Sequence, residues 1–154
     1  MTIRVSTWHS ADFDIYTEFV DPSKSPYTES VKDYAAKVTA FYQRLSVRSA
    51  IWAFPEAEPR NGFDLWKPIE YLLAVNEDRV VAYVDKSGWD KYLHGEQAVF
   101  EFSKTPEHYA GGTTIVIATP VKQEEVIAIR RYRRTNGPQS FELVEETCPG
   151  EALS

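Results

Sequence analysis

The stretch IEYLLAVNEDRVVAYVDK, residues 69–86, determines which folds this chain can adopt. Apolar residues fill nearly every position of 69–76 and of 79–86. Such runs are typical of strands that lie centrally in a sheet covered on both faces. The short acidic pair Glu77-Asp78 between them predicts that the two strands form a hairpin. The sequence therefore predicts a central strand pair around which the other elements assemble.

Further strands are predicted on both sides of this pair. Residues 3–7 and 49–56 precede it in the chain, and three more candidates follow it. Segments 98–104 and 140–146 alternate apolar and polar residues with the period of a strand, and 113–119 is a short β-branched run. These segments bring the expected sheet to about six to seven strands.

Two helices are predicted, one in each half of the chain. In 29–46, after the candidate N-cap Thr28, apolar residues recur at the spacing of one helical face. In 120–136 the start is marked by Thr119-Pro120 and the end by Asn136-Gly137-Pro138.

The predicted order of elements, β-α-β-β-β-β-β-α-β, indicates an α+β fold. We expect a mostly antiparallel sheet packed with the helices 29–46 and 120–136. A chain of 154 residues is long enough for one domain with a substantial core. We expect residues 1–146 to form this single domain and residues 147–154 to form a flexible tail.

Composition indicates a folded, cytoplasmic protein. The apolar content of 43% and the charged content of 26% are ordinary for a globular chain. The single cysteine, Cys148, forms no internal disulfide and suits a reducing compartment. No apolar run reaches the roughly 18 residues of a membrane span, and the N-terminus lacks the apolar core of a signal peptide. We therefore expect no membrane association.

Four arginines, at 130, 131, 133 and 134, stand out in a chain whose formal net charge is −6. On the predicted helix they span an arc of about 160° opposite the apolar residues, so we expect them to face water. Residues 121–137 carry five basic and two acidic side chains, so the remaining chain carries −9. An acidic surface repels nucleic acid. Phosphate binding by the arginines is the weaker alternative, and we expect no direct binding to nucleic acid.

Standard catalytic motifs are absent from the sequence. It contains no GxxxxGK[ST], GxGxxG or GxSxG pattern. His9, His94 and His108 are scattered, and Cys148 lies beside a proline near the C-terminus. We expect no catalytic residues, no metal and no cofactor. A buried pair of carboxylates leaves no motif, so a small enzyme stays open as an alternative.

The segment VDKSGWDKYLHGEQ, residues 84–97, is the best candidate for a binding surface. We interpret it as a glycine-containing loop in which aromatic residues lie among carboxylates. Tryptophan and tyrosine are common anchors of protein interfaces, and flanking carboxylates attract a basic partner. The alternative is that Trp89 packs back onto the core. The candidate partner-binding residues are Asp85, Trp89, Asp90, Tyr92, His94 and Glu96.

Residues 69–146 resemble the deaminase-associated immunity proteins of bacterial polymorphic toxin systems. Members tend to show a strand hairpin, a glycine loop with a tryptophan, and a helix that ends in a Thr-Gly-Pro-like turn before a last strand. Gly88-Trp89, Gly95, Pro120 and the run Thr135-Asn136-Gly137-Pro138 match this pattern. The last strand, Phe141-Glu142-Leu143-Val144, lacks the tryptophan on which the family often ends.

The resemblance implies a small cytoplasmic protein that binds and inhibits a cognate toxin domain. Such toxins act on nucleic acid or nucleotides, so a deaminase or nuclease with a basic surface is the expected partner. Two alternatives remain. One is a small-molecule-binding protein or small enzyme with a pocket between sheet and helices. The other is an adaptor subunit whose partner is not a toxin.

Overall fold

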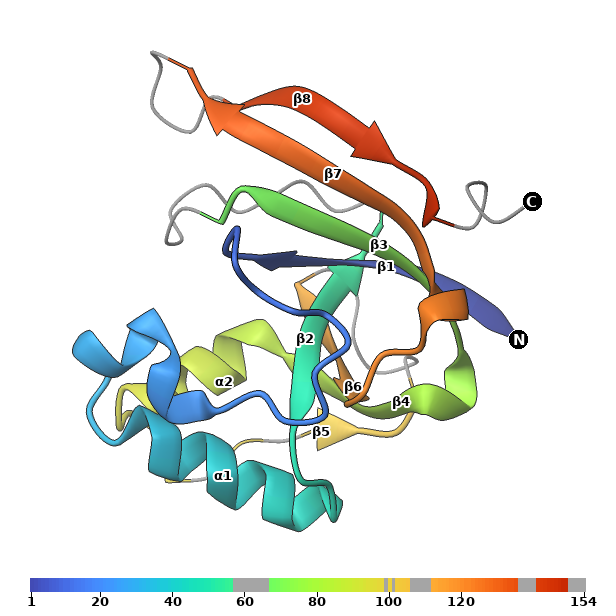
Figure 1. Cartoon of the computed structure of the whole chain (residues 1–154). Helices are drawn as coiled ribbons and strands as arrows, with labels where there is room; N and C mark the ends of the chain where they lie inside the picture. Colours follow the sequence, from blue (N-terminus) through green and yellow to red (C-terminus); the bar gives the residue numbers. More distant parts are fainter. Residues whose placement is uncertain (57–66, 99, 101, 106–111, 136–140, 150–154) are drawn as a thin grey trace.

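A single antiparallel sheet organises the chain. The computed structural model describes residues 1–56, 67–98, 100, 102–105, 112–135 and 141–149. Within these ranges, eight strands follow the spatial order β5-β4-β6-β2-β1-β3-β7-β8, and every pair is antiparallel (Figure 1). The α+β class is confirmed, although the sheet has eight strands rather than six to seven.

The strands and helices have the following bounds. The strands are β1 (Thr2–His9), β2 (Ala50–Pro55), β3 (Ile69–Asn76), β4 (Val80–Asp85), β5 (Phe102–Ser103), β6 (Thr113–Ala118), β7 (Val126–Arg134) and β8 (Phe141–Thr147). The α-helices are α1 (Tyr34–Leu45) and α2 (Lys86–Leu93). Short 3-10 turns lie at Pro22–Lys24, Pro26–Glu29, Glu77–Arg79 and Gln123–Glu125.

The sheet bends where β1 meets β2. These strands pair at only two positions, Val5 with Pro55 and Ser6 with Phe54. On either side of this junction lie two four-stranded halves, β1-β3-β7-β8 and β5-β4-β6-β2. Buried side chains from both halves form one cluster, in which Val5 and Leu73 join Ile51 and Ile117. The bent sheet therefore encloses a core between its own halves.

Both helices cover the other face of the β5-β4-β6-β2 half (Figure 1). The buried side chains between this half and the helices form a second core. Alternate residues of one strand lie in the two cores, since side chains along a strand point to opposite faces. On β2, Ile51 faces the core between the halves and Ala50 faces the helices. Phe41 of α1 and Trp89 of α2 lie in this second cluster. No helix in the described ranges is long and apolar enough to span a bilayer.

The first predicted helix is confirmed in its core but begins later than expected. Helix α1 runs from Tyr34 to Leu45, whereas Thr28 lies within a 3-10 turn and donates its hydroxyl to the Ser25 carbonyl. Asp33, immediately before α1, adopts a left-handed φ of 57°. This backbone reversal separates the turn from the helix.

The predicted hairpin between 69–76 and 79–86 is wrong, although both segments are strands. Strand β3 pairs with β1 and β7, whereas β4 pairs with β5 and β6 in the other half of the sheet. The 3-10 turn at Glu77–Arg79 redirects the chain, and Arg79 forms an ion pair with buried Glu125 at 3.0 Å. Arg79 also donates to the carbonyls of Ala118 and Pro120. This clamp holds the chain where it passes between the halves.

The predicted helix 120–136 is also wrong, because its central part is strand β7. Residues between Val126 and Arg131 pair with β3, and those from Ile129 to Arg134 pair with β8. The Thr119 hydroxyl donates to the Glu18 carbonyl instead of capping a helix. Cross-strand partners outweigh the helical propensity of arginine here, because β8 brings glutamates beside the arginines. The predicted stop at Asn136-Gly137-Pro138 lies outside the described residues.

The remaining strand predictions agree with the structure to within a few residues at each end, except for 98–104. There β5 covers only Phe102–Ser103, and residues 99 and 101 lie outside the described residues. Strand β8 continues to Thr147, one residue past the predicted domain end. Of the predicted tail, residues 150–154 lie outside the described residues.

Candidate functional site

The segment predicted as a binding loop, 84–97, forms helix α2 over most of its length. The Asp85 carboxylate caps this helix by accepting a hydrogen bond from the Gly88 amide at 3.2 Å. Gly95 follows the helix with a left-handed φ of 78°, a conformation that favours glycine at a helix end. Trp89 and Leu93 are four residues apart, so both can face the sheet from one side of the helix.

Trp89, one of the predicted partner-binding residues, is buried and is not an exposed anchor. Only 9% of its surface is exposed. Its ring lies 4.8 Å from Trp52, 4.8 Å from Phe100 and 5.5 Å from Phe41, measured between centroids. A large aromatic side chain is stabilised by burial against other rings, and α2 is close enough to the sheet to allow it. The alternative in which Trp89 packs onto the core is confirmed.

Tyr92 is half-buried at the edge of the same cluster. Its ring centroid lies 5.6 Å from that of Trp89 and 4.9 Å from that of Phe100. Lys37 of α1 places its ammonium 5.6 Å from the Tyr92 ring and donates to the Leu93 carbonyl at 2.8 Å. A positive charge at the C-terminal end of α2 is favourable, because the last carbonyls of a helix are partly negative. Tyr92 thus belongs mainly to the contact between α1 and α2.

The other candidate residues of this segment lie together around one open hollow. This surface hollow has a volume of about 400 Å³. Asp90, His94 and Glu96 are exposed at its wall, and Asp85 lies there as the helix cap. Four of the six predicted residues are therefore neighbours in space. The full lining is Asp85, Lys86, Ser87, Asp90, Lys91, His94, Glu96 and Gly112.

The three histidines have different surroundings. His94 is exposed, and His108 lies outside the described residues. The His9 ring stacks on Phe13 at 3.8 Å, and its Nε2 atom lies 2.7 Å from the Thr7 hydroxyl oxygen. Burial, together with the positive charge of Lys67, lowers the pKa of His9 to about 3. No cluster of His, Cys, Asp or Glu among the described residues could hold a metal ion.

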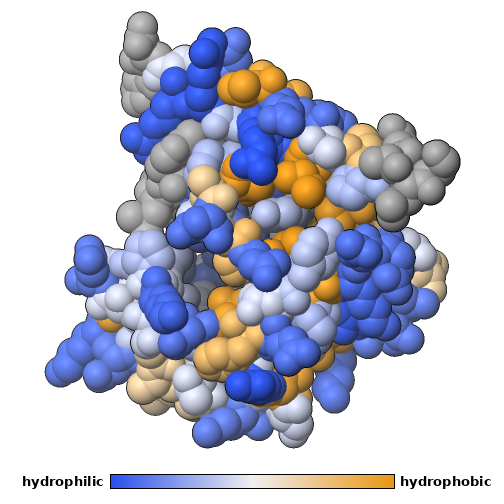
Figure 2. Space-filling model, in the orientation of Figure 1, coloured by the Kyte–Doolittle hydropathy of each residue, from blue (hydrophilic) through white to orange (hydrophobic). Residues whose placement is uncertain are grey.

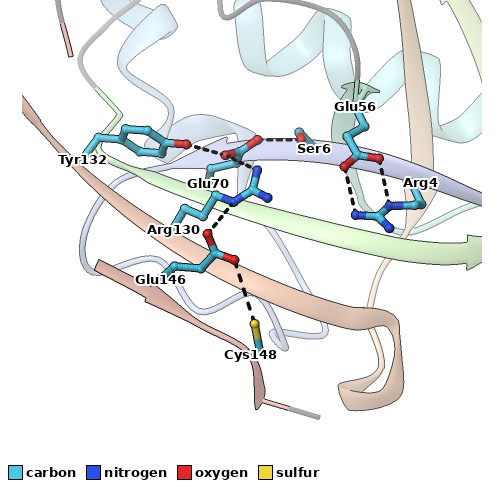
Figure 3. Close-up of polar contacts among 8 residues, drawn as sticks. All are labelled: Arg4, Ser6, Glu56, Glu70, Arg130, Tyr132, Glu146 and Cys148. Atoms are coloured by element: carbon cyan, nitrogen blue, oxygen red, sulfur yellow. Dashed lines mark hydrogen bonds and ion pairs between the residues drawn. The ribbon is translucent and has the colours of Figure 1, made fainter. Parts of the chain in front are cut away.

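A second polar cluster, centred on Glu70 of β3, was not predicted (Figure 3). The Glu70 carboxylate is only 6% exposed and accepts hydrogen bonds from Ser6 at 2.7 Å and Tyr132 at 2.8 Å. Arg130 lies 3.4 Å from Glu70 and 3.3 Å from Glu146. The one available signal was an acidic residue between apolar neighbours in IEYLLAVN.

Burial and the charge of Glu70 shift the pKa of Tyr132 in the same direction, but they act in opposite directions on Arg130. Burial, together with the hydrogen bond and charge of Glu70, raises the pKa of Tyr132 to about 12 against the opposing effect of Arg130. Burial opposes the charge of Arg130, but Glu70 and Glu146 outweigh it and raise the pKa of the guanidinium. Each donor is directed at the carboxylate, which is typical of a network that holds strands in register. Arg4 and Glu56 form a separate, exposed ion pair at 2.8 Å (Figure 3).

Three of the four arginines of β7 form ion pairs with glutamates of the neighbouring strands. Arg131 and Arg133 pair with Glu145 and Glu142 of β8, at 3.8 and 2.8 Å. The sheet therefore balances the charge of the arginines with that of neighbouring carboxylates. The arginines lie on a strand instead of the predicted helix. Arg131, Arg133 and Arg134 are nevertheless exposed to water, as expected, and Arg130 is half-buried.

Comparison of the chain with protein-family models, with curated protein sequences and with solved structures finds no match.

Proposed function

We propose that this chain is an immunity-type protein, a cytoplasmic inhibitor that binds a basic toxin domain and blocks its active site. The observation that carries the proposal is the convergence of Asp85, Asp90, His94 and Glu96 on the hollow beside α2. These residues were selected from the sequence as partner contacts. Their exposed carboxylates, imidazole and neighbouring lysines offer polar groups of both signs, as the rim of a protein interface does.

The distribution of charge favours a basic partner. Arg130, Arg131, Arg133 and Arg134 share one sheet with four glutamates at 70, 142, 145 and 146. The formal charge of −6 is therefore carried by the rest of the chain. The hollow itself contains three carboxylates and two lysines, so the long-range attraction comes from the whole molecule. Such a field speeds association with a basic domain and weakens as salt is added.

The alternative of a ligand pocket between the sheet and the helices has less support. Aromatic rings occupy that space in the described structure, where Phe41, Trp52, Trp89 and Phe100 have centroids within 5.6 Å of a neighbour. A thermal-shift screen with small metabolites tests this alternative, because a ligand that binds the folded state raises the melting temperature.

The proposal is tested with the product of the gene next to the one that encodes this chain. We expect that product to be toxic when expressed alone, and co-expression of this chain to restore growth. Surface plasmon resonance should show fast association at low salt and slower association as salt rises. Replacing Asp90 with Asn and Glu96 with Gln should lower the association rate by about three- to tenfold.

A matched control carries the same change of charge away from the hollow. Glu29 and Glu124 are exposed, and replacing both with Gln also removes two negative charges from the protein. We expect a smaller effect from this pair than from the pair at the hollow. If the neighbouring product is not toxic, or is neither bound nor neutralised, the immunity function is wrong. If both pairs act equally, the function stands and the hollow is not the contact surface.

A further inference from the structure

Strand β8 forms an open outer edge of the sheet. It pairs with β7, and no other described strand pairs with its second side. All residues from Glu142 to Thr147 are exposed. The opposite edge of the sheet, β5, has only two residues. An exposed edge presents unpaired N–H and C=O groups to which another strand can bind. In Figure 1, β8 lies at the far end of the sheet from α2.

Side-chain charge follows a regular pattern from β7 to this edge. Three of the paired positions carry an arginine on β7 and a glutamate on β8, so each of these three lateral rows ends on a carboxylate. These carboxylates are between 41% and 60% exposed. A strand added beside β8 would lie about 4.8 Å away, with its side chains next to the carboxylates. The rows join Arg133 to Glu142, Arg131 to Glu145 and Arg130 to Glu146.

Apolar contact area lies between these carboxylates. Leu143 and Val144 are 48% and 59% exposed, which places them among the few large hydrophobic residues open to solvent. The ladder shifts here, so Val144 has no opposite residue on β7. In Figure 2, hydrophobic atoms lie among strongly hydrophilic ones over the β7–β8 part of the molecule. Mixed apolar and charged surface of this kind favours a partner strand that alternates between the same two classes.

A second copy of this chain is a poor occupant of the edge. Pairing β8 with β8 would bring Glu142, Glu145 and Glu146 of one copy beside those of the other. Like charges on neighbouring strands are destabilising, and natural sheets use charged residues on an edge to prevent such pairing. The same carboxylates each pair with an arginine of β7 but stay 41–60% exposed, so their remaining lone pairs can accept hydrogen bonds from lysine or arginine. Repulsion of like strands and attraction of basic ones together give selectivity.

We propose that the free edge of β8 is a second docking surface, which binds an extended, basic segment of a partner protein as a ninth strand. Lysine or arginine side chains of the segment lie next to Glu142, Glu145 and Glu146, and its apolar side chains contact Leu143 and Val144. This surface is separate from the hollow beside α2, and it does not depend on the identity of the partner as a toxin.

The test uses a short peptide of alternating lysine and valine, blocked at both ends, and the same peptide with glutamate in place of lysine. Hydrogen exchange followed by NMR reports which backbone amides the peptide protects. We expect the basic peptide to slow exchange of amides in 142–147 by about tenfold or more, and the acidic peptide to leave them unchanged. Amides of α2 should not change with either peptide.

Two charge-matched variants separate edge pairing from general attraction. Glu142→Gln with Glu145→Gln removes two carboxylates from the edge, and Glu29→Gln with Glu124→Gln removes two elsewhere. We expect the first pair to weaken binding of the basic peptide by about tenfold and the second by less than about twofold. Urea unfolding confirms that both variants are folded.

Equal weakening by both pairs, or protection away from 142–147, would overturn the proposal. So would dimerisation of the free protein through β8, detected by sedimentation and abolished by Val144→Asp, since a second copy would then be the occupant. Neither outcome bears on the hollow, whose test uses other residues and another partner.

Discussion

Replacing Glu70 with glutamine should destabilise the protein through one buried carboxylate. Glu70 accepts from Ser6 at 2.7 Å and from Tyr132 at 2.8 Å, and it lies opposite Arg130 on the neighbouring strand. The amide of glutamine keeps the shape but has only one acceptor oxygen and no charge. Either the Ser6 or the Tyr132 hydroxyl must then reorient, because it faces the amide nitrogen instead of an oxygen. The contact with Arg130 is no longer an ion pair.

The magnitude follows from the number of hydrogen bonds affected. Hydrogen bonds to a charged group contribute about 1.5–3 kcal/mol each, and those between neutral groups about 1 kcal/mol. Two such bonds change from charged to neutral, so we expect Glu70→Gln to lower the free energy of unfolding by about 2 kcal/mol. Urea unfolding, followed by tryptophan fluorescence, should show a midpoint about 1 M lower, given typical denaturant slopes.

Glu146→Gln is the matched control, since Glu146 contacts the same Arg130 from the surface. The Glu146 side chain is 41% exposed, so its ion pair is screened by water and should contribute less than about 1 kcal/mol. A double-mutant cycle between Glu70→Gln and Tyr132→Phe should show coupling, because one hydrogen bond joins the two groups. If Glu70→Gln costs no more than Glu146→Gln, the structural role assigned to the buried network is wrong.

Two further predictions concern the buried rings. Trp89→Ala should lower the free energy of unfolding by about 3–5 kcal/mol, measured by urea unfolding, because it leaves a cavity among Trp52, Phe41 and Phe100; a loss below about 1 kcal/mol would contradict this packing. His9 has a folded pKa of about 3, below the value of about 6.5 in an unfolded chain, so its contribution is complete above about pH 6.5 and is lost as pH falls toward 3. Between about pH 7 and pH 5 the wild type should therefore lose about 2 kcal/mol more than His9→Gln, and a variant with the same pH dependence as wild type would refute this.

The strands of the core could be predicted from sequence because burial on both faces leaves a continuous apolar pattern. Segments 69–76, 79–86 and 113–119 are strands as expected. Their partners could not be predicted, because pairing depends on contacts between distant parts of the chain. Adjacent apolar strands favoured a hairpin, whereas the clamp between Arg79 and Glu125 sends them to opposite halves of the sheet.

At the candidate site, local sequence patterns predicted the exposure of the polar residues but not the helix or the burial of Trp89. Two glycines suggested a loop at 84–97, although Trp89 and Leu93 have helical spacing and Asp85 provides a cap. Asp90, His94 and Glu96 are exposed around one hollow, because polar residues beside a buried helical face stay in solvent. The aromatic residue chosen as an anchor was the least exposed of the group, since an aromatic side chain is stabilised most where it is buried.

The spacing of charges on β7 and β8 explains why the arginine run was difficult to recognise as a strand. On β7 the two arginines of one face are Arg131 and Arg133, two residues apart, whereas their partners Glu145 and Glu142 are three residues apart. In an unbroken ladder Val144 would lie opposite Arg131, and Glu145 would lie opposite Arg130. The bulge at Val144 takes up the extra residue and brings each glutamate to its arginine. The sequence therefore contains complementary charges in the segments that form β7 and β8. Their spacings differ by one residue, so the charges match only if β8 contains a bulge.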